Sequence, residues 1–269
     1  MPDVEFSAAQ DLELIGEAAA EGGRIAMHYF KRKQEVWMKE GDSPVGEADY
    51  AVDKYLRETL TAARPHYGWL SEETVDSPAR LTASRTFVVD PIDGTRAFID
   101  GRSTWCVSVA VVENGRPLAG ILVCPAKSEI FAASLGGGAT RNGRRLAVDK
   151  PSAQPIIGGP KQLIAALPPH LGDVVRKADY VPSLAYRLAM VATGQLDGSY
   201  VKPHSHDWDL AAADLILAEA GGAVVDAGGR RLAYATTADP SHGVLVAGSG
   251  PLLDELVAAL GRPSAQASA

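Results

Sequence analysis

The sequence predicts an α+β N-terminal half followed by an α/β C-terminal half. Apolar residues recur at helical spacing as far as residue 63, and short β-rich runs separated by turn signals come after them. Beyond a stretch rich in proline and glycine at 151–160, helical and extended patterns alternate. We therefore expect two domains, an α+β domain over residues 1–150 and an α/β domain over residues 151–269.

The chain has the composition of an ordinary globular protein. Its 269 residues are 46% hydrophobic and 22% charged, and 33 acidic against 26 basic side chains give a net charge of −7. General binding to nucleic acid or to an anionic membrane needs a basic face, which this charge balance argues against. We expect neither as a partner, although a local basic pocket is compatible with the total.

The N-terminus and the cysteines favour a cytoplasmic protein. Residues 1–6 show no basic region followed by an apolar stretch, so no signal peptide is expected. No run reaches the roughly 18 apolar residues that a membrane helix needs. Cys106 and Cys124 lie in apolar runs, and we interpret them as buried thiols in a reducing compartment rather than as a redox or metal pair.

The elements of the first half are predicted from their spacing. Leu12, Ile15 and Ala19 lie on one stripe of a helix predicted over residues 8–30, and a second helix is predicted over residues 48–63. The period then changes to that of strands. Strands are predicted at 87–89, 106–112, 119–123 and 130–132, and the Asn142-Gly143 pair predicts a hairpin turn before a strand at 146–148.

Helical and extended segments alternate in the second half. The Pro, Ser and Ala residues at the C-terminal end are expected to fray. Helices are predicted at 184–192, 209–220 and 251–260, and extended segments at 198–201, 223–225 and 243–247.

The most informative segment is Asp90-Pro91-Ile92-Asp93-Gly94-Thr95. An apolar strand delivers two acids, Pro91 fixes a turn between them, and Gly94 permits a backbone geometry that other residues resist. Asp90 and Asp93 are therefore expected to face one point. The N–H groups of Gly94 and Thr95 could form an anion-binding nest if they open a short helix. Two carboxylates that face one point are able to bind metal ions, and metal ions beside an anion-binding nest indicate a site for phosphate.

Two further acids extend this pattern. Glu72 follows a short apolar strand, and Asp209, in Asp207-Trp208-Asp209, stands at the start of an apolar helix. Each has a plain alternative: Asp209 alone would be read as a helix N-cap, and Glu72 alone as a surface residue. The combination of all four acids carries more weight than any one of them.

Together these motifs resemble the inositol monophosphatase family. The Asp90-to-Thr95 motif is preceded by Ser71-Glu72-Glu73 and followed by Trp208-Asp209, and the match runs from Asp42-Ser43-Pro44-Val45 to the final strand. The resemblance implies a layered αβαβα sandwich and a Mg²⁺-dependent phosphate monoesterase. Such enzymes are usually homodimeric and often inhibited by Li⁺, and the expected partner is a small phosphorylated metabolite.

The resemblance also implies roles for particular residues. Thr95 matches the residue that orients the attacking water, Asp49 matches its hydrogen-bond partner, and Glu72 would touch both metal and water. Carboxylate and carbonyl oxygens are the hard donors that Mg²⁺ requires. His204 and His206 invite a zinc reading, but no His and Cys ligand set surrounds them. The matched ligands of two or three Mg²⁺ ions are Glu72, Asp90, the carbonyl of Ile92, Asp93 and Asp209.

In the mechanism that the resemblance implies, the metal ions neutralise the phosphate oxygens, and the backbone N–H groups of Gly94 and Thr95 hold the phosphoryl group that is transferred to water. No covalent nucleophile is needed. The residues expected to contact the substrate are Asp93, Gly94, Thr95, Ser183, Lys202 and Asp209.

The sequence departs from the inositol-hydrolysing branch at the substrate end. A family glutamate that binds sugar hydroxyls falls here on Val201 or Lys202, and Lys202 either binds a second anionic group or points into solvent. Tyr186 and Arg187 follow Ser183 where inositol enzymes carry Gly-Thr-Ala, and packing and surface roles are as well supported for them as ligand contact. We favour a 3'(2'),5'-bisphosphate nucleotide or a related monoester, with inositol 1-phosphate and histidinol phosphate as alternatives.

A rival hypothesis is a noncatalytic regulator that senses a phosphate ligand or binds transcription machinery. The complete acid set, together with Thr95 and Asp49, argues for the enzyme.

Overall fold

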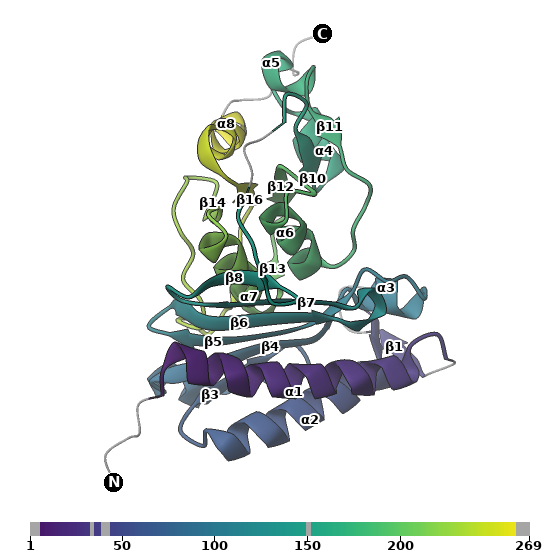
Figure 1. Cartoon of the computed structure of the whole chain (residues 1–269), viewed down its shortest axis with the longest axis vertical. Coiled ribbons are helices and arrows are strands. Elements are labelled where there is room, and N and C mark those ends of the chain that lie inside the picture. Colours follow the sequence, from purple (N-terminus) through teal and green to yellow (C-terminus); the bar gives the residue numbers. More distant parts are fainter. Residues whose placement is uncertain (1–5, 33–34, 39–43, 149–151, 262–269) are drawn as a thin grey trace.

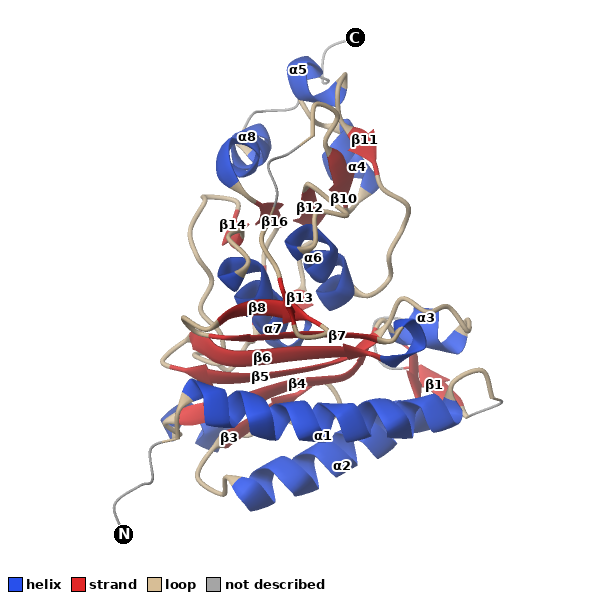
Figure 2. Ribbon diagram, in the orientation of Figure 1, coloured by secondary structure: helices blue, strands red, loops and turns tan. Residues whose placement is uncertain are grey.

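Layers of helices and sheets alternate through the molecule, as the computed structural model shows (Figure 1). The structure describes residues 6–32, 35–38, 44–148 and 152–261. From one end to the other, the layers are a helix pair, a seven-stranded sheet, a second helix pair, a five-stranded sheet and an outer set of helices (Figure 2). This order confirms the predicted αβαβα sandwich.

The first helix layer consists of α1 (Ala8–Tyr29) and α2 (Glu47–Ala63). The hydroxyl of Ser7 accepts the backbone N–H of Gln10 at 3.2 Å and so caps α1. Ile15 and other buried residues of α1 pack with residues of α2 against one face of the large sheet. Both predicted helices are confirmed to within one residue at each end.

The seven-stranded sheet has the order β3-β4-β5-β6-β7-β8-β9. Strands β3 and β4 are parallel, and the other neighbouring pairs are antiparallel. Because helices cover both faces, the central strands β4 and β5 are buried almost throughout instead of alternating between buried and exposed residues. The strands are β3 (Gly68–Ser71), β4 (Arg85–Asp93), β5 (Cys106–Glu113), β6 (Arg116–Cys124), β7 (Glu129–Ser134), β8 (Gly138–Arg141) and β9 (Arg144–Arg145).

The predicted hairpin at Asn142-Gly143 exists, but the strand after it was misplaced. Asn142 and Gly143 have φ angles of 49° and 74° and join β8 to β9. The expected strand at 146–148 is absent from the described chain, and the N–H groups of Leu146 and Val148 instead donate to the carbonyls of Ala139 and Ala220. Leu146 and Val148 lie in the segment that leads to the second half of the chain, and both pack against the core.

The central helix layer contains α6 (Leu184–Ala192) and α7 (Asp207–Glu219). Gly120 of β6 lies against α7 so closely that a Cβ there would stand 3.0 Å from the Cα of Ala212. One core cluster therefore joins residues of the large sheet to residues of both helices. The chain changes sheets near the predicted division at residue 150, yet this core is shared across it.

The five-stranded sheet has the order β11-β10-β12-β16-β14. Strand β10 is parallel to β11 and β12, and β16 is antiparallel to β12 and β14. Its strands are β10 (Ile156–Gly158), β11 (Arg176–Lys177), β12 (Gly198–Val201), β14 (Ala223–Asp226) and β16 (Leu245–Gly248), and its outer helices are α4 (Lys161–Ala165), α5 (Pro169–Gly172) and α8 (Gly250–Leu260). The sequence did not predict α4, α5 or β11.

The remaining elements are short. They are β1 (Val36–Met38), β2 (Pro44–Gly46), α3 (Thr95–Ile99), β13 (Ser205–His206), β15 (Ser241–His242) and the 3₁₀ helices η1 (Pro78–Thr82) and η2 (Pro125–Lys127).

Some of the predictions concern residues that the structure does not describe. Asp42, Ser43, Pro151 and the C-terminal tail after residue 261 lie outside the described residues. Cys106 and Cys124 are both buried free thiols, as expected. Of the described helices, none combines the length and apolarity required to cross a bilayer.

Candidate active site

Asp90 and Asp93 lie at the C-terminal end of strand β4 in the large sheet. The strand continues through both acids, so the turn expected at Pro91 is wrong. Its pairing with β5 instead shifts register between Asp90 and Asp93, which face Ser108 and Cys106. Three steps along β4 thus match two along β5, as at a β-bulge. The bulge suits Pro91, which has no N–H to donate.

Asp209 reaches the same place from the central helix layer. It is the third residue of α7, and its Oδ2 accepts the backbone N–H of His206, the actual N-cap residue, at 2.7 Å. The plain N-cap reading of Asp209 is therefore wrong by three positions. Asp207 anchors the same turn, because its carboxylate accepts from the N–H of Ala235 at 2.6 Å and lies 2.7 Å from Nε2 of His242.

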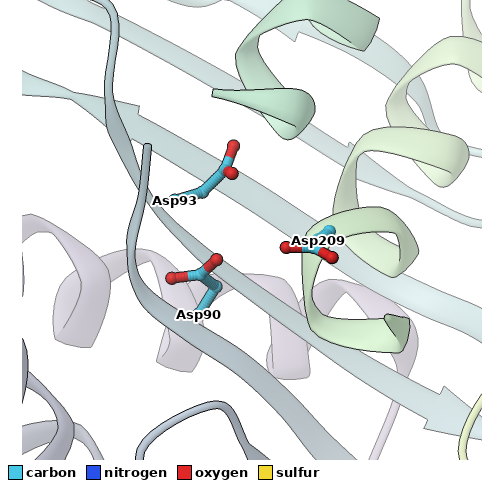
Figure 3. Close-up of side chains that lie close together, drawn as sticks. All are labelled: Asp90, Asp93 and Asp209. Carbon is cyan, nitrogen blue, oxygen red and sulfur yellow. The ribbon is translucent and has the colours of Figure 1, made fainter. Parts of the chain in front are cut away.

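The three aspartates form one cluster. Asp90, Asp93 and Asp209 each offer a carboxylate oxygen, and these oxygens all lie within 4.8 Å of one another. Figure 3 shows the three carboxylates grouped around one space between β4 and the start of α7. Asp90 and Asp93 are buried and Asp209 is half-buried. Hard oxygen donors at this spacing are able to hold a divalent cation.

Burial and mutual repulsion raise the pKa of each member of the cluster. The pKa of Asp90 is raised well above its usual range by burial and by the charges of Glu72 and Asp93. The pKa of Asp209 is raised by burial and by Asp93 and Glu72. Burial raises the pKa of Asp93 to about 6, against hydrogen bonds that favour its charged form.

Those hydrogen bonds come from the start of α6. The carboxylate of Asp93 accepts the N–H of Leu184 at 3.1 Å, the N–H of Ala185 at 2.6 Å and the hydroxyl of Ser183. The hydroxyl of Ser183 also accepts the N–H of Tyr186 at 3.0 Å and so caps α6. Asp93 therefore joins the large sheet to the central helix layer.

Glu72 lies beside this cluster. Its backbone N–H donates to the carbonyl of Val89, which places it next to Asp90 across the parallel pair β3 and β4. It is half-buried and lines the same cleft as the aspartates. Its carboxylate is outside the group of oxygens that lie within 4.8 Å of one another.

Gly94 and Thr95 begin α3, as the sequence predicted. Gly94 has a φ of 92°, and a Cβ there would stand 2.9 Å from the Cβ of Ser183, so only glycine fits. The hydroxyl of Thr95 lies 3.3 Å from Oδ1 of Asp49 and 3.1 Å from the carbonyl oxygen of Ile92. Oδ2 of Asp49 accepts the N–H of Gly46 at 2.9 Å.

A cleft of about 1360 Å³ opens over these residues. Its lining residues come from the large sheet and from the segments around α4, β11 and α6. Ile92 and Asp49 do not line it, but both contact the hydroxyl of Thr95, which does. Of the residues predicted from the sequence, it is lined by Glu72, Asp90, Asp93, Gly94, Thr95, Lys202 and Asp209.

Two expectations about α6 need correction. Ser183 was expected to contact the substrate, but its side chain is fully buried and engaged with Asp93 and Tyr186. Arg187 is not a surface residue, because it is only 9% exposed. It nevertheless lines the cleft. Tyr186 packs inside, as one of its two readings predicted, with its hydroxyl donating to Glu129 at 2.8 Å.

The sequence also missed part of the cleft wall. Lys161 and Lys177 line it from α4 and β11, in a segment that carried no recognisable motif. His204 and His206, for which structural or substrate-contact roles were expected, line it as well, and the ring of His206 stacks on Trp208 with centroids 4.6 Å apart. Lys161 and Lys177 were missed because α4 and β11 are too short to show a period.

Comparison with known proteins agrees with this geometry. The inositol monophosphatase family model matches residues 9–264. The inositol monophosphatase of Dictyostelium discoideum is 33% identical over 221 residues, which cover 77% of this chain and 81% of that protein. The histidinol-phosphatase of Chlorobaculum parvum is 33% identical over 229 residues, which cover 82% of this chain and 87% of that protein.

Solved structures give the same result. The extragenic suppressor protein suhB from Bartonella henselae has a TM-score of 0.82 and 27% identity, with 94% of this chain and 99% of that chain covered. The chain belongs to the inositol monophosphatase family and is a phosphoric monoester hydrolase that acts on small phosphate monoesters.

Proposed function

We propose that the cleft hydrolyses its phosphate monoester with Mg²⁺ and an attacking water held by the protein. The observation that carries this proposal is the convergence of Asp90, Asp93 and Asp209 in one cleft from two distant parts of the chain. A set of carboxylates that raise one another's pKa is suited to a divalent cation, which would relieve their repulsion.

The proposed ligands of two or three Mg²⁺ ions are the three aspartates, Glu72 and the carbonyl oxygen of Ile92. When bound, the ions would neutralise phosphoryl oxygens and make the attacking water more acidic. The carbonyl oxygen of Ile92 lies 3.1 Å from the hydroxyl of Thr95, and it is free to bind a metal when that hydroxyl donates its single hydrogen bond to Asp49. Li⁺ is proposed to inhibit by competing for these oxygens.

Thr95, Asp49 and Glu72 are proposed to position the water. When the hydroxyl of Thr95 donates to Asp49, its lone pairs are left to accept a hydrogen bond from the water. Asp49 is itself fixed by the N–H of Gly46, so the hydroxyl of Thr95 has a defined direction. Glu72, on the neighbouring strand end, is the second acceptor for the water.

The phosphoryl group is proposed to lie against the N–H groups of Gly94 and Thr95. Its contacts with Asp93 and Asp209 would be shared with the metals, and Lys202 would contact the leaving group. Ser183, being buried, serves by holding Asp93 in place. The enzyme is proposed to work in the cytoplasm as a homodimer.

We favour a 3'(2'),5'-bisphosphate nucleotide or a related monoester as the substrate. Val201 and Lys202 both line the cleft, and neither can replace the glutamate expected in an inositol-hydrolysing site. Inositol 1-phosphate and histidinol phosphate are the alternatives, and relatives of this chain bear the names of both enzymes.

Phosphate release tests the proposal. Adenosine 3',5'-bisphosphate, inositol 1-phosphate, histidinol phosphate and fructose 1,6-bisphosphate are each assayed with Mg²⁺ and with EDTA, using wild type and Asp93→Asn. We expect release that needs Mg²⁺, is lost in the variant and is fastest with the adenosine compound. Release that persists in EDTA or in a folded Asp93→Asn protein would overturn the mechanism, and a clear preference for inositol phosphate would overturn the substrate.

A further inference from the structure

Arg187 is a buried cation in the wall of the cleft. It lies one turn along α6 from the N–H groups that bind Asp93, and its side chain is only 9% exposed. Its Nε donates to the hydroxyl of Ser199 at 3.0 Å, and its two terminal nitrogens donate to the carbonyls of Val181 at 3.3 Å and Tyr200 at 3.4 Å. All three acceptors are neutral.

The other buried arginines of the described chain are treated differently. Arg80 pairs with Asp76 at 2.7 Å, and Arg85 pairs with Asp11 and Glu113, each at 2.8 Å. Within the described residues, no carboxylate forms an ion pair with Arg187, and it is the one of the three that lines the cleft. A guanidinium in this position bears the cost of burial without an ion-pair partner, and the carboxylates whose charges act on it are those of Asp93 and Asp209.

Arg187 retains donors for a ligand. A guanidinium carries five N–H donors, and three are used. The space beside it depends on Gly158, where a Cβ would stand 3.2 Å from Cδ of Arg187. Lys161, Lys177 and Lys202 line the same cleft. Besides the aspartate cluster and Glu72, the cleft is lined by one further acidic residue of the described chain, the exposed Asp179.

We propose that Arg187 binds a second anionic group, a phosphate or carboxylate on the leaving-group side of the substrate, and so selects substrates with two anionic groups. The inference rests on the proposed function of the cleft. A planar fork of donors fits either oxyanion, and the three lysines add positive charge at longer range. The aspartate cluster, with its metals, would take the phosphate that is cleaved.

Matched substrate pairs test this inference. Adenosine 3',5'-bisphosphate is compared with adenosine 3'-monophosphate, and 2-phosphoglycerate with glycerol 2-phosphate; the members of each pair differ by one anionic group. Wild type is expected to show a lower KM for the doubly anionic member of at least one pair, and that pair identifies phosphate or carboxylate. In Arg187→Gln, this KM should rise about tenfold, with kcat and the singly anionic member changed less than about threefold.

Two further variants guard against a merely structural effect. Arg187→Lys keeps a cation but loses the fork, so it should restore part of the preference, and Lys202→Gln should have a smaller effect because Lys202 is exposed. If wild type shows no preference in either pair, or Arg187→Gln slows both members alike, the inference is wrong and the phosphatase activity still stands. If no substrate releases phosphate with Mg²⁺, the proposed function itself fails.

Discussion

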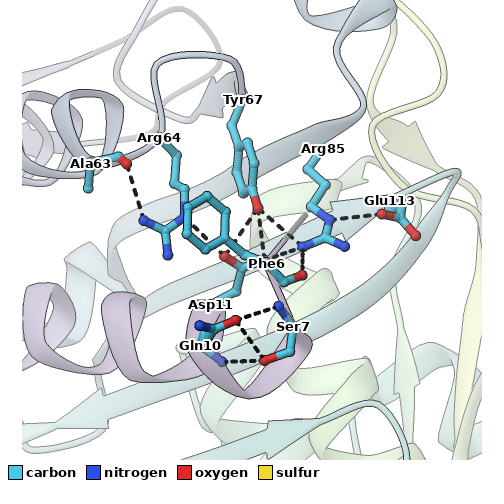
Figure 4. A network of polar contacts seen from close by, with 9 residues as sticks. All are labelled: Phe6, Ser7, Gln10, Asp11, Ala63, Arg64, Tyr67, Arg85 and Glu113. Carbon is cyan, nitrogen blue, oxygen red and sulfur yellow. Dashed lines mark hydrogen bonds and ion pairs between the residues drawn. The ribbon is translucent and has the colours of Figure 1, made fainter. Parts of the chain in front are cut away.

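Two buried acidic groups in this molecule are arranged in opposite ways. Near the N-terminus, the fully buried Asp11 lies 2.8 Å from Nη1 of Arg85 and 3.5 Å from Nε of Arg64, and it accepts the hydroxyl of Tyr67 (Figure 4). In the cleft, three carboxylates are brought together, and no lysine or arginine of the described chain forms an ion pair with them.

The difference separates structural from functional burial of charge. The Asp11 network joins α1, the end of α2 and β4 through ion pairs, so each charge has an opposite charge beside it, even though Nε of Arg64 donates no hydrogen bond within the described chain. The aspartate cluster is left with unbalanced negative charge, and the raised pKa values of its members express that cost. Such an arrangement is typical of a site that a ligand completes. Replacing an aspartate with asparagine should therefore stabilise the metal-free protein in the cluster and destabilise it in the Asp11 network.

The largest expected effect is that of Asp90→Asn on activity. Loss of one ligand charge should lower kcat/KM by about 10³-fold, because the phosphoryl charge is then poorly neutralised. The metal-free protein should become more stable by about 1 kcal/mol or more, since one unit of pKa elevation corresponds to about 1.4 kcal/mol. Steady-state kinetics and denaturant unfolding in EDTA measure both. A variant that is less stable without metal would contradict the comparison.

Asp11→Asn is the matched substitution in the other region. It leaves two arginines without their shared carboxylate, and we expect a loss of about 3–5 kcal/mol in the free energy of unfolding. The activity of the molecules that remain folded should stay at the wild-type value, because Asp11 does not line the cleft. Urea unfolding and kinetics at low temperature check this. A fall in kcat at unchanged fold would mean that the network also serves the site.

The pH dependence of stability should follow the cluster. Asp93 has a pKa of about 6 in the folded protein against 3.8 ordinarily, so the folded state binds more protons than the unfolded state between these values. The contribution of Asp93 to stability is therefore lost as pH rises from about 4 to 6. In EDTA, the Tm difference between Asp90→Asn and wild type should grow over this range, and Mg²⁺ should reduce it. A difference independent of both pH and Mg²⁺ would count against the account.

Ser183→Ala should have the smallest effect. Asp93 keeps its two backbone N–H donors, so kcat should fall less than about tenfold, and loss of the N-cap of α6 should cost about 1 kcal/mol. Ser7→Ala removes the cap of α1 at similar cost and should leave kcat unchanged. If the two variants had equal kcat values, the hydroxyl of Ser183 would have no role in holding Asp93.

The sequence predicted the parts of this site that come as local motifs. The Asp90-to-Thr95 segment contains its own strand, bulge and helix start, so the order of its residues is enough to place them together. Arg187 could not be understood in this way, because its burial depends on Ser199 and Tyr200 of β12, a separate element. Lys161 and Lys177 were missed for the same reason. Lys177 lies on β11, which is joined to the sheet through β10, and Lys161 begins α4 after that strand.

The central claim is that Asp90, Asp93 and Asp209 together hold the metal. Its most direct test is calorimetric titration of Mg²⁺ into the metal-free wild type and into Asp90→Asn, each first shown to be folded. The account predicts saturable binding by wild type and a loss of that binding in the variant. Equal binding by both proteins, or none by the wild type, would contradict it.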